Sequence, residues 1–92
     1  MYYLITYDIS SPKRQRRIVS FCKDYGQRIQ KSVFECHLTQ TQFETLWESL
    51  LTVANPKEDH IIAYPICQSC IKNVHQFPRK KIRSEKPLVY VF

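Results

Sequence analysis

YYLITYD at residues 2–8, followed by ISSP at residues 9–12, is the stretch that decides the fold. The run from Tyr2 to Tyr7 is rich in β-formers and carries apolar side chains on both faces, as in a central strand that is covered on both sides. The strand ends at Asp8. Ser11 suits the N-cap of a helix and Pro12 suits its first position, where a missing N–H has no cost, so a helix follows directly.

That helix is expected over residues 12–25, because apolar side chains recur there at helical spacing, at Ile18, Phe21, Cys22 and Tyr25. Gly26 is expected to end the helix in the left-handed conformation. Residues 27–38 then predict two short strands joined by a tight turn near Lys31-Ser32.

A second helix is expected after Thr39, which forms a capping box with Gln42. Leu38 and Phe43 flank the box as a hydrophobic staple. The helix carries one apolar stripe, formed by Phe43, Leu46, Trp47, Leu50, Leu51 and Ala54. Asn55-Pro56 ends it, and residues 60–67 predict the next strand.

The resulting order is strand, helix, strand, strand, helix, strand, followed by a short strand at 88–92. It predicts an α+β fold of the ferredoxin-like βαββαβ class, an antiparallel sheet with two helices on one face. The 92 residues allow one domain, with a core over 1–78, a basic linker over 79–87 and the extra C-terminal strand. That strand is expected to pair with a sheet edge, that of the partner subunit in a homodimer.

Basic residues are concentrated in two segments, 13–31 and 72–86, which flank an acidic middle and give a net charge of +6. Such segregation attracts a polyanion, most commonly nucleic acid, whereas solvated surface charge is the plainer alternative. Arg79, Lys80 and Lys81 are candidates for binding DNA. The single glycine excludes a glycine-rich phosphate loop. No apolar run is long enough to span a membrane, so a cytoplasmic protein is expected.

Asp8 is the most informative candidate for chemistry, because it stands between a central strand and a helix. The alternative is that its carboxylate only accepts backbone N–H bonds in the turn. The helix starts with four basic residues instead of the acids that its dipole favours, namely Lys13, Arg14, Arg16 and Arg17. A bound phosphate would offset that cost, and Arg14 is expected to point toward the sheet end.

A single carboxylate holds Mg²⁺ poorly, and no other acid is expected near the end of the first strand. A twofold dimer would bring two copies of Asp8 to one axis and supply two carboxylates for one Mg²⁺ ion. Such a site suits phosphodiester cleavage, since the metal activates water and stabilises charge on the phosphate.

The four cysteines give a weaker signal. Cys22 lies on the apolar face of the first helix and is expected in the core. Cys67 and Cys70 form one C-x-x-C pair without a second pair, which is weak evidence for zinc or for redox chemistry, so neither is assigned.

Several of these motifs resemble the small CRISPR-associated endonuclease family, the second of the numbered CRISPR-associated proteins. They are YDIS at 7–10, the arginine-rich helix start, QKSVFE at 30–35, YPICQSC at 64–70 and VYVF at 89–92. The resemblance implies a ferredoxin-like homodimer with Asp8 binding Mg²⁺ at the dimer axis. It also implies work in CRISPR spacer acquisition with the CRISPR integrase as partner, and cleavage of single-stranded RNA or double-stranded DNA.

By position, the resemblance implies phosphate contacts for Arg17 and Arg28, and it places Ser32 and Phe34 near the site. Gln15 stands where some members carry arginine, so Arg14 or Arg16 is expected to take over that role. Three functions remain open: a Mg²⁺-dependent endonuclease, a non-catalytic scaffold dimer that holds DNA for the integrase, and a toxin-like ribonuclease of related fold.

Overall fold

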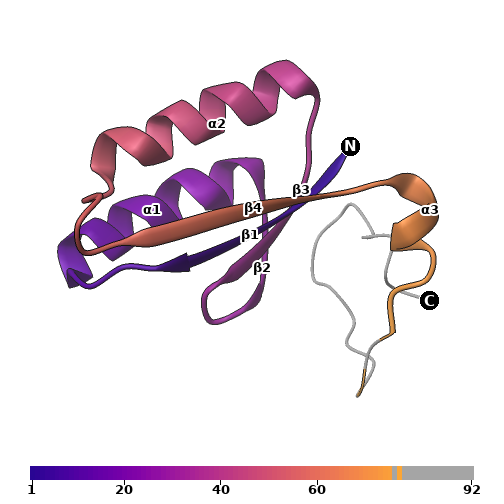
Figure 1. The fold of residues 1–92 in the computed structure, drawn as a ribbon, viewed down its shortest axis with the longest axis horizontal. Helices are drawn as coiled ribbons and strands as arrows, with labels where there is room; N and C mark the ends of the chain where they lie inside the picture. The colour runs from indigo at the N-terminus through magenta and orange to yellow at the C-terminus, as the bar shows by residue number, and fades with distance from the viewer. Residues whose placement is uncertain (76, 78–92) are drawn as a thin grey trace.

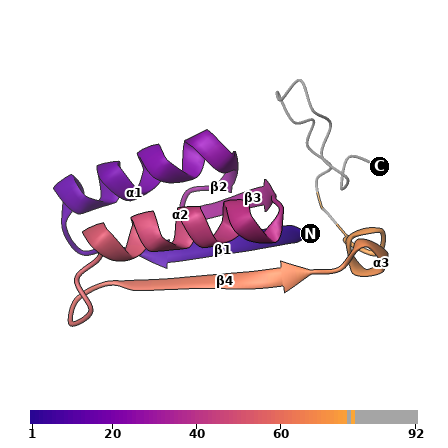
Figure 2. The same ribbon diagram turned by 90° about the horizontal axis from the view of Figure 1, so that it is seen from above.

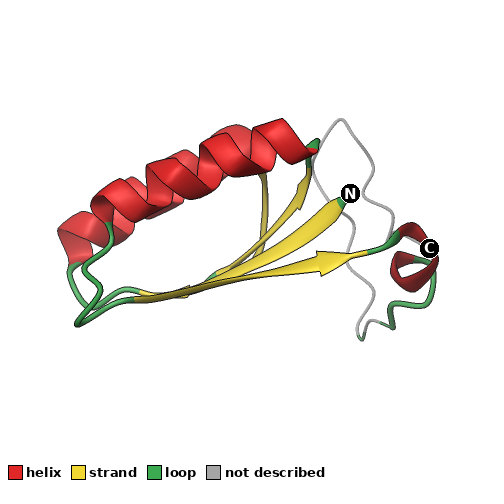
Figure 3. Ribbon diagram, turned by 45° about the horizontal axis from the view of Figure 1, so that its top comes forward, coloured by secondary structure: helices red, strands yellow, loops and turns green. Residues whose placement is uncertain are grey.

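The protein is described by a computed structural model in which residues 1–75 and 77 are placed (Figure 1). Its elements are β1 (Tyr2–Asp8), α1 (Pro12–Tyr25), β2 (Gly26–Gln30), β3 (Val33–His37), α2 (Gln40–Val53), β4 (His60–Ile66) and α3 (Gln68–Ile71). The strands form an antiparallel sheet in the order β2-β3-β1-β4. Helices α1 and α2 lie side by side over one face of it (Figures 2 and 3). The predicted ferredoxin-like βαββαβ order is confirmed.

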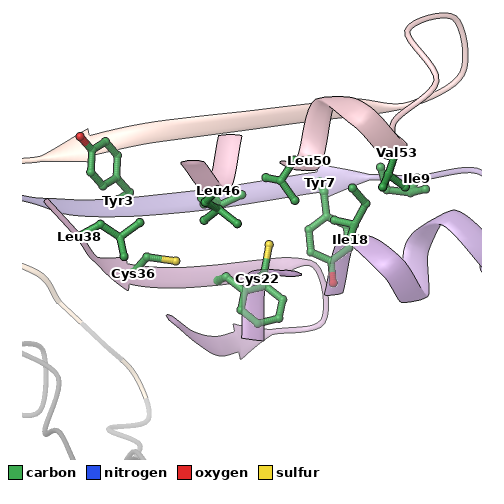
Figure 4. Packing of buried hydrophobic residues seen from close by; sticks show 12 residues of the cluster. Tyr3, Tyr7, Ile9, Ile18, Cys22, Cys36, Leu38, Leu46, Leu50 and Val53 are labelled. Atoms are coloured by element: carbon green, nitrogen blue, oxygen red, sulfur yellow. The ribbon is translucent and has the colours of Figure 1, made fainter. Parts of the chain in front are cut away.

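Strand β1 lies inside the sheet, paired with β3 on one side and β4 on the other. Tyr3 and Tyr7 of β1 join Cys36 of β3, Ile18 of α1 and Leu50 of α2 in one buried cluster between the sheet and the helices (Figure 4). Each large apolar side chain buried in this way stabilises the fold by roughly 1.5–3 kcal/mol. Asp8 is therefore held by a strand that is paired with a neighbour on each side. The expectation that this strand is covered on both faces is wrong for one copy of the chain, because α1 and α2 cover one face while Leu4 and Thr6 are only half-buried on the other.

Both helix starts follow the sequence signals. The N–H of Arg14 donates to Ser11 Oγ at 3.3 Å, and Thr39 and Gln42 exchange both hydrogen bonds of a capping box. The expected apolar stripe of α2 is wrong at Leu51, which is 55% exposed, while Val53 is buried instead. Leu51 is turned about 100° from Leu50 around the helix, which takes it beyond the edge of the sheet-facing stripe.

Gly26 corrects a second expectation. Its φ is −162°, so it is extended and forms the first residue of β2, not a left-handed helix cap. Glycine is needed there because of close approach: a Cβ atom would overlap both Cys36 Sγ and the carbonyl oxygen of Glu35. The absence of a side chain lets β2 pair with β3 directly after the helix.

A one-turn helix, α3, follows β4 in a part of the chain where no helix or strand was predicted. Ile71, 1% exposed, anchors it. The predicted linker at 79–87 and the predicted strand at 88–92 lie outside the described residues. Within the described part of the chain, no helix has the length and apolar character needed to cross a bilayer.

Candidate metal and nucleic-acid site

Asp8 is exposed at the last position of β1, level with His60 of β4. Beside it lies a shallow hollow of about 420 Å³, lined by Tyr7, Asp8, Ile9, Gln15, Lys31 and Ser32. The strand end, the first helical turns and the β2–β3 turn therefore meet at Asp8. This confirms the expected position of Asp8 on a rigid strand and brings Ser32 to the same hollow.

Tyr7 fixes the β2–β3 turn beside Asp8. Its hydroxyl donates to the carbonyl oxygen of Lys31 at 3.1 Å, and its backbone N–H donates to the carbonyl oxygen of Ser32 at 3.2 Å. Because Tyr7 itself is buried in the core, these two bonds hold the turn at a constant distance from the end of β1. The exposed side chains of Lys31 and Ser32 thus line the hollow from a fixed backbone.

Arg28 is tied to the same tyrosine. Its Nη2 donates to Tyr7 Oη at 3.1 Å, and its guanidinium lies 5.7 Å from the centre of the Phe34 ring. A cation over an aromatic face is favourable and leaves the outer edge of the guanidinium open to an anion. Phe34 is fully buried, so its ring supports Arg28 from below and does not reach the surface with Ser32.

A second hollow, of about 560 Å³, lies between α1 and β2. Its lining residues are Pro12, Gln15, Arg16, Val19, Ser20, Lys23 and Arg28. We call this second hollow the basic groove. Gln15 lines both hollows, so the basic groove adjoins the hollow beside Asp8. Three cations, from Arg16, Lys23 and Arg28, face one groove, an arrangement that suits a phosphate backbone.

Lys23 is not among the residues predicted from the sequence, and Arg16 is predicted there only as an alternative to Arg14. Arg16, Val19, Ser20 and Lys23 recur at three- and four-residue spacing, so the helical period could have placed them on one face. That β2 lies beside this face follows only from the tertiary fold. Arg17 is exposed and lines neither hollow, and Arg79, Lys80 and Lys81 lie outside the described residues.

Arg14 has carboxylate partners within the chain. Its Nε donates to Asp59 Oδ2 at 2.8 Å and its Nη2 to Glu58 Oε1 at 3.1 Å. The expectation that no other acid lies near the end of the first strand is therefore wrong. The error arose because both acids precede β4 in the sequence, and antiparallel pairing of β4 with β1 carries them to this end of the sheet.

Asp59 also joins two loops. Its carboxylate accepts from the backbone N–H of Ser10 at 3.0 Å and from that of Asn55 at 2.8 Å, and its side chain is fully buried. The hydrogen bond from Arg14, followed by those from Asn55 and Ser10, lowers the pKa of Asp59 below its usual range. The same bond raises the pKa of Arg14. Both groups are thus held in their charged forms beside the site.

Asp8 is therefore the carboxylate at this end of the sheet that remains open to a ligand, while Asp59 and Glu58 bind Arg14. Within residues 1–75 and 77, no three His, Cys, Asp or Glu side chains gather as a metal site. At this end of the sheet, the described residues of one copy consequently offer one free carboxylate, that of Asp8, next to a hydroxyl from Ser32 and a groove lined by cations.

Comparison with known proteins identifies the family. A family model described as CRISPR associated protein Cas2 matches residues 1–74. The chain belongs to the Cas2 family. Among curated Cas2 relatives, the "CRISPR-associated endoribonuclease Cas2 1" of Moorella thermoacetica is 42% identical over 82 residues, which cover 84% of this chain and 85% of that relative.

Solved Cas2 structures agree with this assignment. Cas2 of Streptococcus pyogenes superimposes with a TM-score of 0.75 at 35% identity, covering 84% of this chain and 99% of that one. A chain of a partial Cas6-RT-Cas1–Cas2 complex superimposes with a TM-score of 0.66 at 28% identity, covering 83% and 89%. The resemblance seen in the sequence motifs is thus confirmed at the level of the Cas2 family and its fold.

Proposed function

We propose that the chain is a metal-dependent endonuclease that cleaves phosphodiester bonds of single-stranded RNA or double-stranded DNA and works in CRISPR spacer acquisition. The observation that carries the proposal is the position of Asp8, exposed at the end of a rigid strand and adjoining a groove with three cations. The endoribonuclease name of the Moorella relative supports the same activity.

The donor set of one chain fits a metal ion incompletely. Asp8 is its one free carboxylate at this end of the described structure, and Mg²⁺ is usually held by one or two carboxylates with water completing its shell. One copy of Asp8 is the minimum of that range, and two copies related by a twofold axis would supply two carboxylates to a single Mg²⁺ ion. A Mg²⁺ ion held there would activate a water and stabilise charge on the phosphate.

The protein's own residues provide binding and orientation. Arg28, held by Tyr7 and Phe34, presents its guanidinium to a phosphate, while Arg16 and Lys23 line the same groove. Such contacts bind any sequence, because the phosphate backbone carries no sequence information. Arg14, at the start of α1, has a structural role instead. Its ion pairs with Glu58 and Asp59 link the helix to the loop before β4 at the edge of the site.

The sheet supports the homodimer that this site requires. Leu4 and Thr6 of β1 pair with Tyr64 and Ile62 of β4 on the face that α1 and α2 leave uncovered. Tyr64 is 49% exposed there. A broad, partly apolar sheet face can be covered by a second copy of itself, which buries apolar surface in both subunits.

The partner proposed for the dimer is the CRISPR integrase, Cas1. The similarity to a chain of the partial Cas6-RT-Cas1–Cas2 complex supports it. The same similarity favours a second candidate function, a non-catalytic scaffold that holds duplex DNA through the basic groove. In the scaffold, Asp8 would have no chemical part, so the two functions make opposite predictions for this residue.

The test compares the full chain with Asp8→Ala on labelled single-stranded RNA and double-stranded DNA, with Mg²⁺ or EDTA. The nuclease predicts cleavage that requires both Mg²⁺ and Asp8, with a loss of at least about 10²-fold in the variant. Asp24→Ala, an exposed acid in the last turn of α1, is the matched control and should cleave normally. Salt-sensitive duplex binding by wild type and Asp8→Ala, without cleavage by either, would overturn the nuclease in favour of the scaffold.

A further inference from the structure

The four cysteines fall into two classes that differ in exposure. Cys22 and Cys36 are fully buried in the core, where burial raises the pKa of each thiol to about 12. Cys67 and Cys70 are exposed, and none of the four forms a disulfide in the structure. The first pair is therefore protected by the fold, while the second is open to reagents in solution.

The exposed pair sits on a fixed backbone. Cys67 immediately follows β4, and its carbonyl oxygen accepts the N–H of Ile71 at 3.0 Å, which closes the turn of α3. Ile71 is buried and anchors this turn. Cys67 is the N-cap of α3 and Cys70 is its third residue, and the side chains of the two are close enough for a hydrogen bond between the thiols.

The surroundings of Cys67 favour its thiolate. Its Sγ lies 3.2 Å from Ser69 Oγ, and hydrogen bonds from the Ser69 hydroxyl and then from the Cys70 thiol lower the pKa of Cys67 to about 7. The contact with Cys67 raises the pKa of Cys70. Cys67 therefore has the larger thiolate fraction, as an attacking cysteine does, and Cys70 the smaller one, as a resolving cysteine does.

Access to the two sulfurs also differs. A hollow of about 300 Å³, lined by Met1, Tyr2, His37, Cys67 and Gln68, opens beside Cys67 at the end of β4. Cys70 is not among its lining residues. A small reagent seated in this hollow would meet Cys67 first.

We propose that Cys67 and Cys70 form a dithiol that a low-molecular-weight disulfide, of the glutathione disulfide class, oxidises reversibly to an intramolecular disulfide. Nothing in the metal-dependent cleavage proposed above requires this chemistry. In the described residues no third His, Cys, Asp or Glu joins the pair, so a metal ion would find only two protein ligands. The geometry therefore favours a dithiol over a zinc site.

The reaction balances in two exchange steps. The thiolate of Cys67 attacks one sulfur of the small disulfide, which breaks its S–S bond, forms a mixed disulfide and releases one thiol that takes up the proton lost by Cys67. Cys70 then loses its proton and attacks Cys67 Sγ, which forms the intramolecular bond and releases the second thiol. The protein dithiol is oxidised by two electrons and the small disulfide is reduced to two thiols.

The thiol pair and Asp8 lie at opposite ends of the sheet. β1 and β4 are antiparallel, with Asp8 level with His60 and Tyr2 level with Ile66, the residue before Cys67. Figure 1 shows α3 at the end of the sheet where the N-terminus lies. Replacement of Cys67 or Cys70 should therefore leave any cleavage at Asp8 unchanged, so the two proposals can fail separately.

The experiment incubates the reduced full chain with glutathione buffers of increasing oxidised fraction, quenches with acid, and maps thiols by differential alkylation and mass spectrometry. We expect a disulfide joining residues 67 and 70, reversed by excess reduced glutathione, while Cys22 and Cys36 react only after denaturation. Cys70→Ser should stop at a mixed disulfide on Cys67. Cys67→Ser, the matched control, should form little adduct on Cys70.

Alkylation of the reduced protein provides a second readout. At pH 7, Cys67 should react about threefold faster than an unperturbed thiol, since its larger thiolate fraction outweighs its lower nucleophilicity. The proposal is overturned if both thiols stay reduced in oxidising buffer, or if Cys67 reacts no faster than Cys70. It is also overturned if a chelator must first be added before either thiol reacts, since that result would indicate a metal site.

Discussion

Arg14 and Asp59 make a two-point contact across 45 residues of sequence, with Arg14 Nε 2.8 Å from Asp59 Oδ2 and Nη2 3.1 Å from Oδ1. Through Ser10 and Asn55, the same carboxylate holds the loop after β1 and the loop after α2. The backbone on the helix side of Asp8 is thus fixed by charge, while Tyr7 fixes the turn on its other side.

Asp59→Asn should lower the midpoint of thermal unfolding at pH 7. The Asp59 carboxylate accepts hydrogen bonds from Arg14, Ser10 and Asn55, and the substitution removes its charge. The folded-state pKa of Asp59 is lowered, so its stabilising effect is present above its unfolded pKa, about 3.9, and is lost as pH falls below that value. The difference between variant and wild type should therefore shrink in acid. Glu58→Gln, at an exposed carboxylate, should change the midpoint much less. Equal effects of the two variants would contradict this assignment.

Glu35 predicts the opposite pH dependence. It is 5% exposed, and burial raises its pKa to about 7. Its neutral form is the one that the fold accommodates, so stability is full below the unfolded pKa, about 4.3, and falls as pH rises through about 7. Glu35→Gln should be near neutral at pH 4 and stabilising at pH 8 by about 1–3 kcal/mol in urea unfolding. If the unfolding free energies of wild type and Glu35→Gln had the same pH dependence, the burial of this carboxyl would be contradicted.

Arg28→Ala tests the basic groove. Removal of one phosphate contact should weaken binding to duplex DNA and reduce the slope of log K against log salt by about 1. Lys57→Ala removes an exposed cation from the loop between α2 and β4, far from the groove in sequence, and serves as the control. Circular dichroism checks that neither variant unfolds. An unchanged slope in Arg28→Ala would show that the groove does not bind phosphate.

Gly26→Ala should destabilise the protein by at least about 2 kcal/mol, since the new Cβ would meet a sulfur and a carbonyl oxygen. Gly26→Asn tests whether glycine is needed for close approach to β3 or for a left-handed backbone. Asparagine tolerates the left-handed region, so it would be the milder change there. At the extended φ of −162° it should be at least as harmful as alanine. A milder effect of asparagine in thermal unfolding would contradict the close-approach explanation.

The sequence was most informative where a local signal decides the structure. Helix α1 begins as predicted because Ser11 and Pro12 act within one turn, and the order of helices and strands along the chain followed from the lengths and spacing of apolar runs. Signals that depend on tertiary contacts were missed. The conformation of Gly26 follows from its strand neighbour Cys36, and the partners of Arg14 come from a strand end 45 residues away.

The candidate site divides in the same way. Asp8 could be singled out from its place between strand and helix, Ser32 from the motif at 30–35 that resembles Cas2 proteins, and Arg28 from its position in the same resemblance. Arg16 and Lys23 became groove residues only once β2 was seen beside α1. The sequence did not show whether the Phe34 side chain is buried or exposed, because this depends on the register of β3 with β1.

The most direct test of the account asks whether one site needs Asp8 from both subunits. A heterodimer with one wild-type and one Asp8→Asn subunit, isolated through two affinity tags, is compared with both homodimers for Mg²⁺-dependent cleavage of RNA and DNA. The account predicts that the heterodimer cleaves as poorly as the Asp8→Asn homodimer, because one shared ion loses a ligand. A heterodimer that keeps half of the wild-type rate would contradict it, since each Asp8 would then act alone.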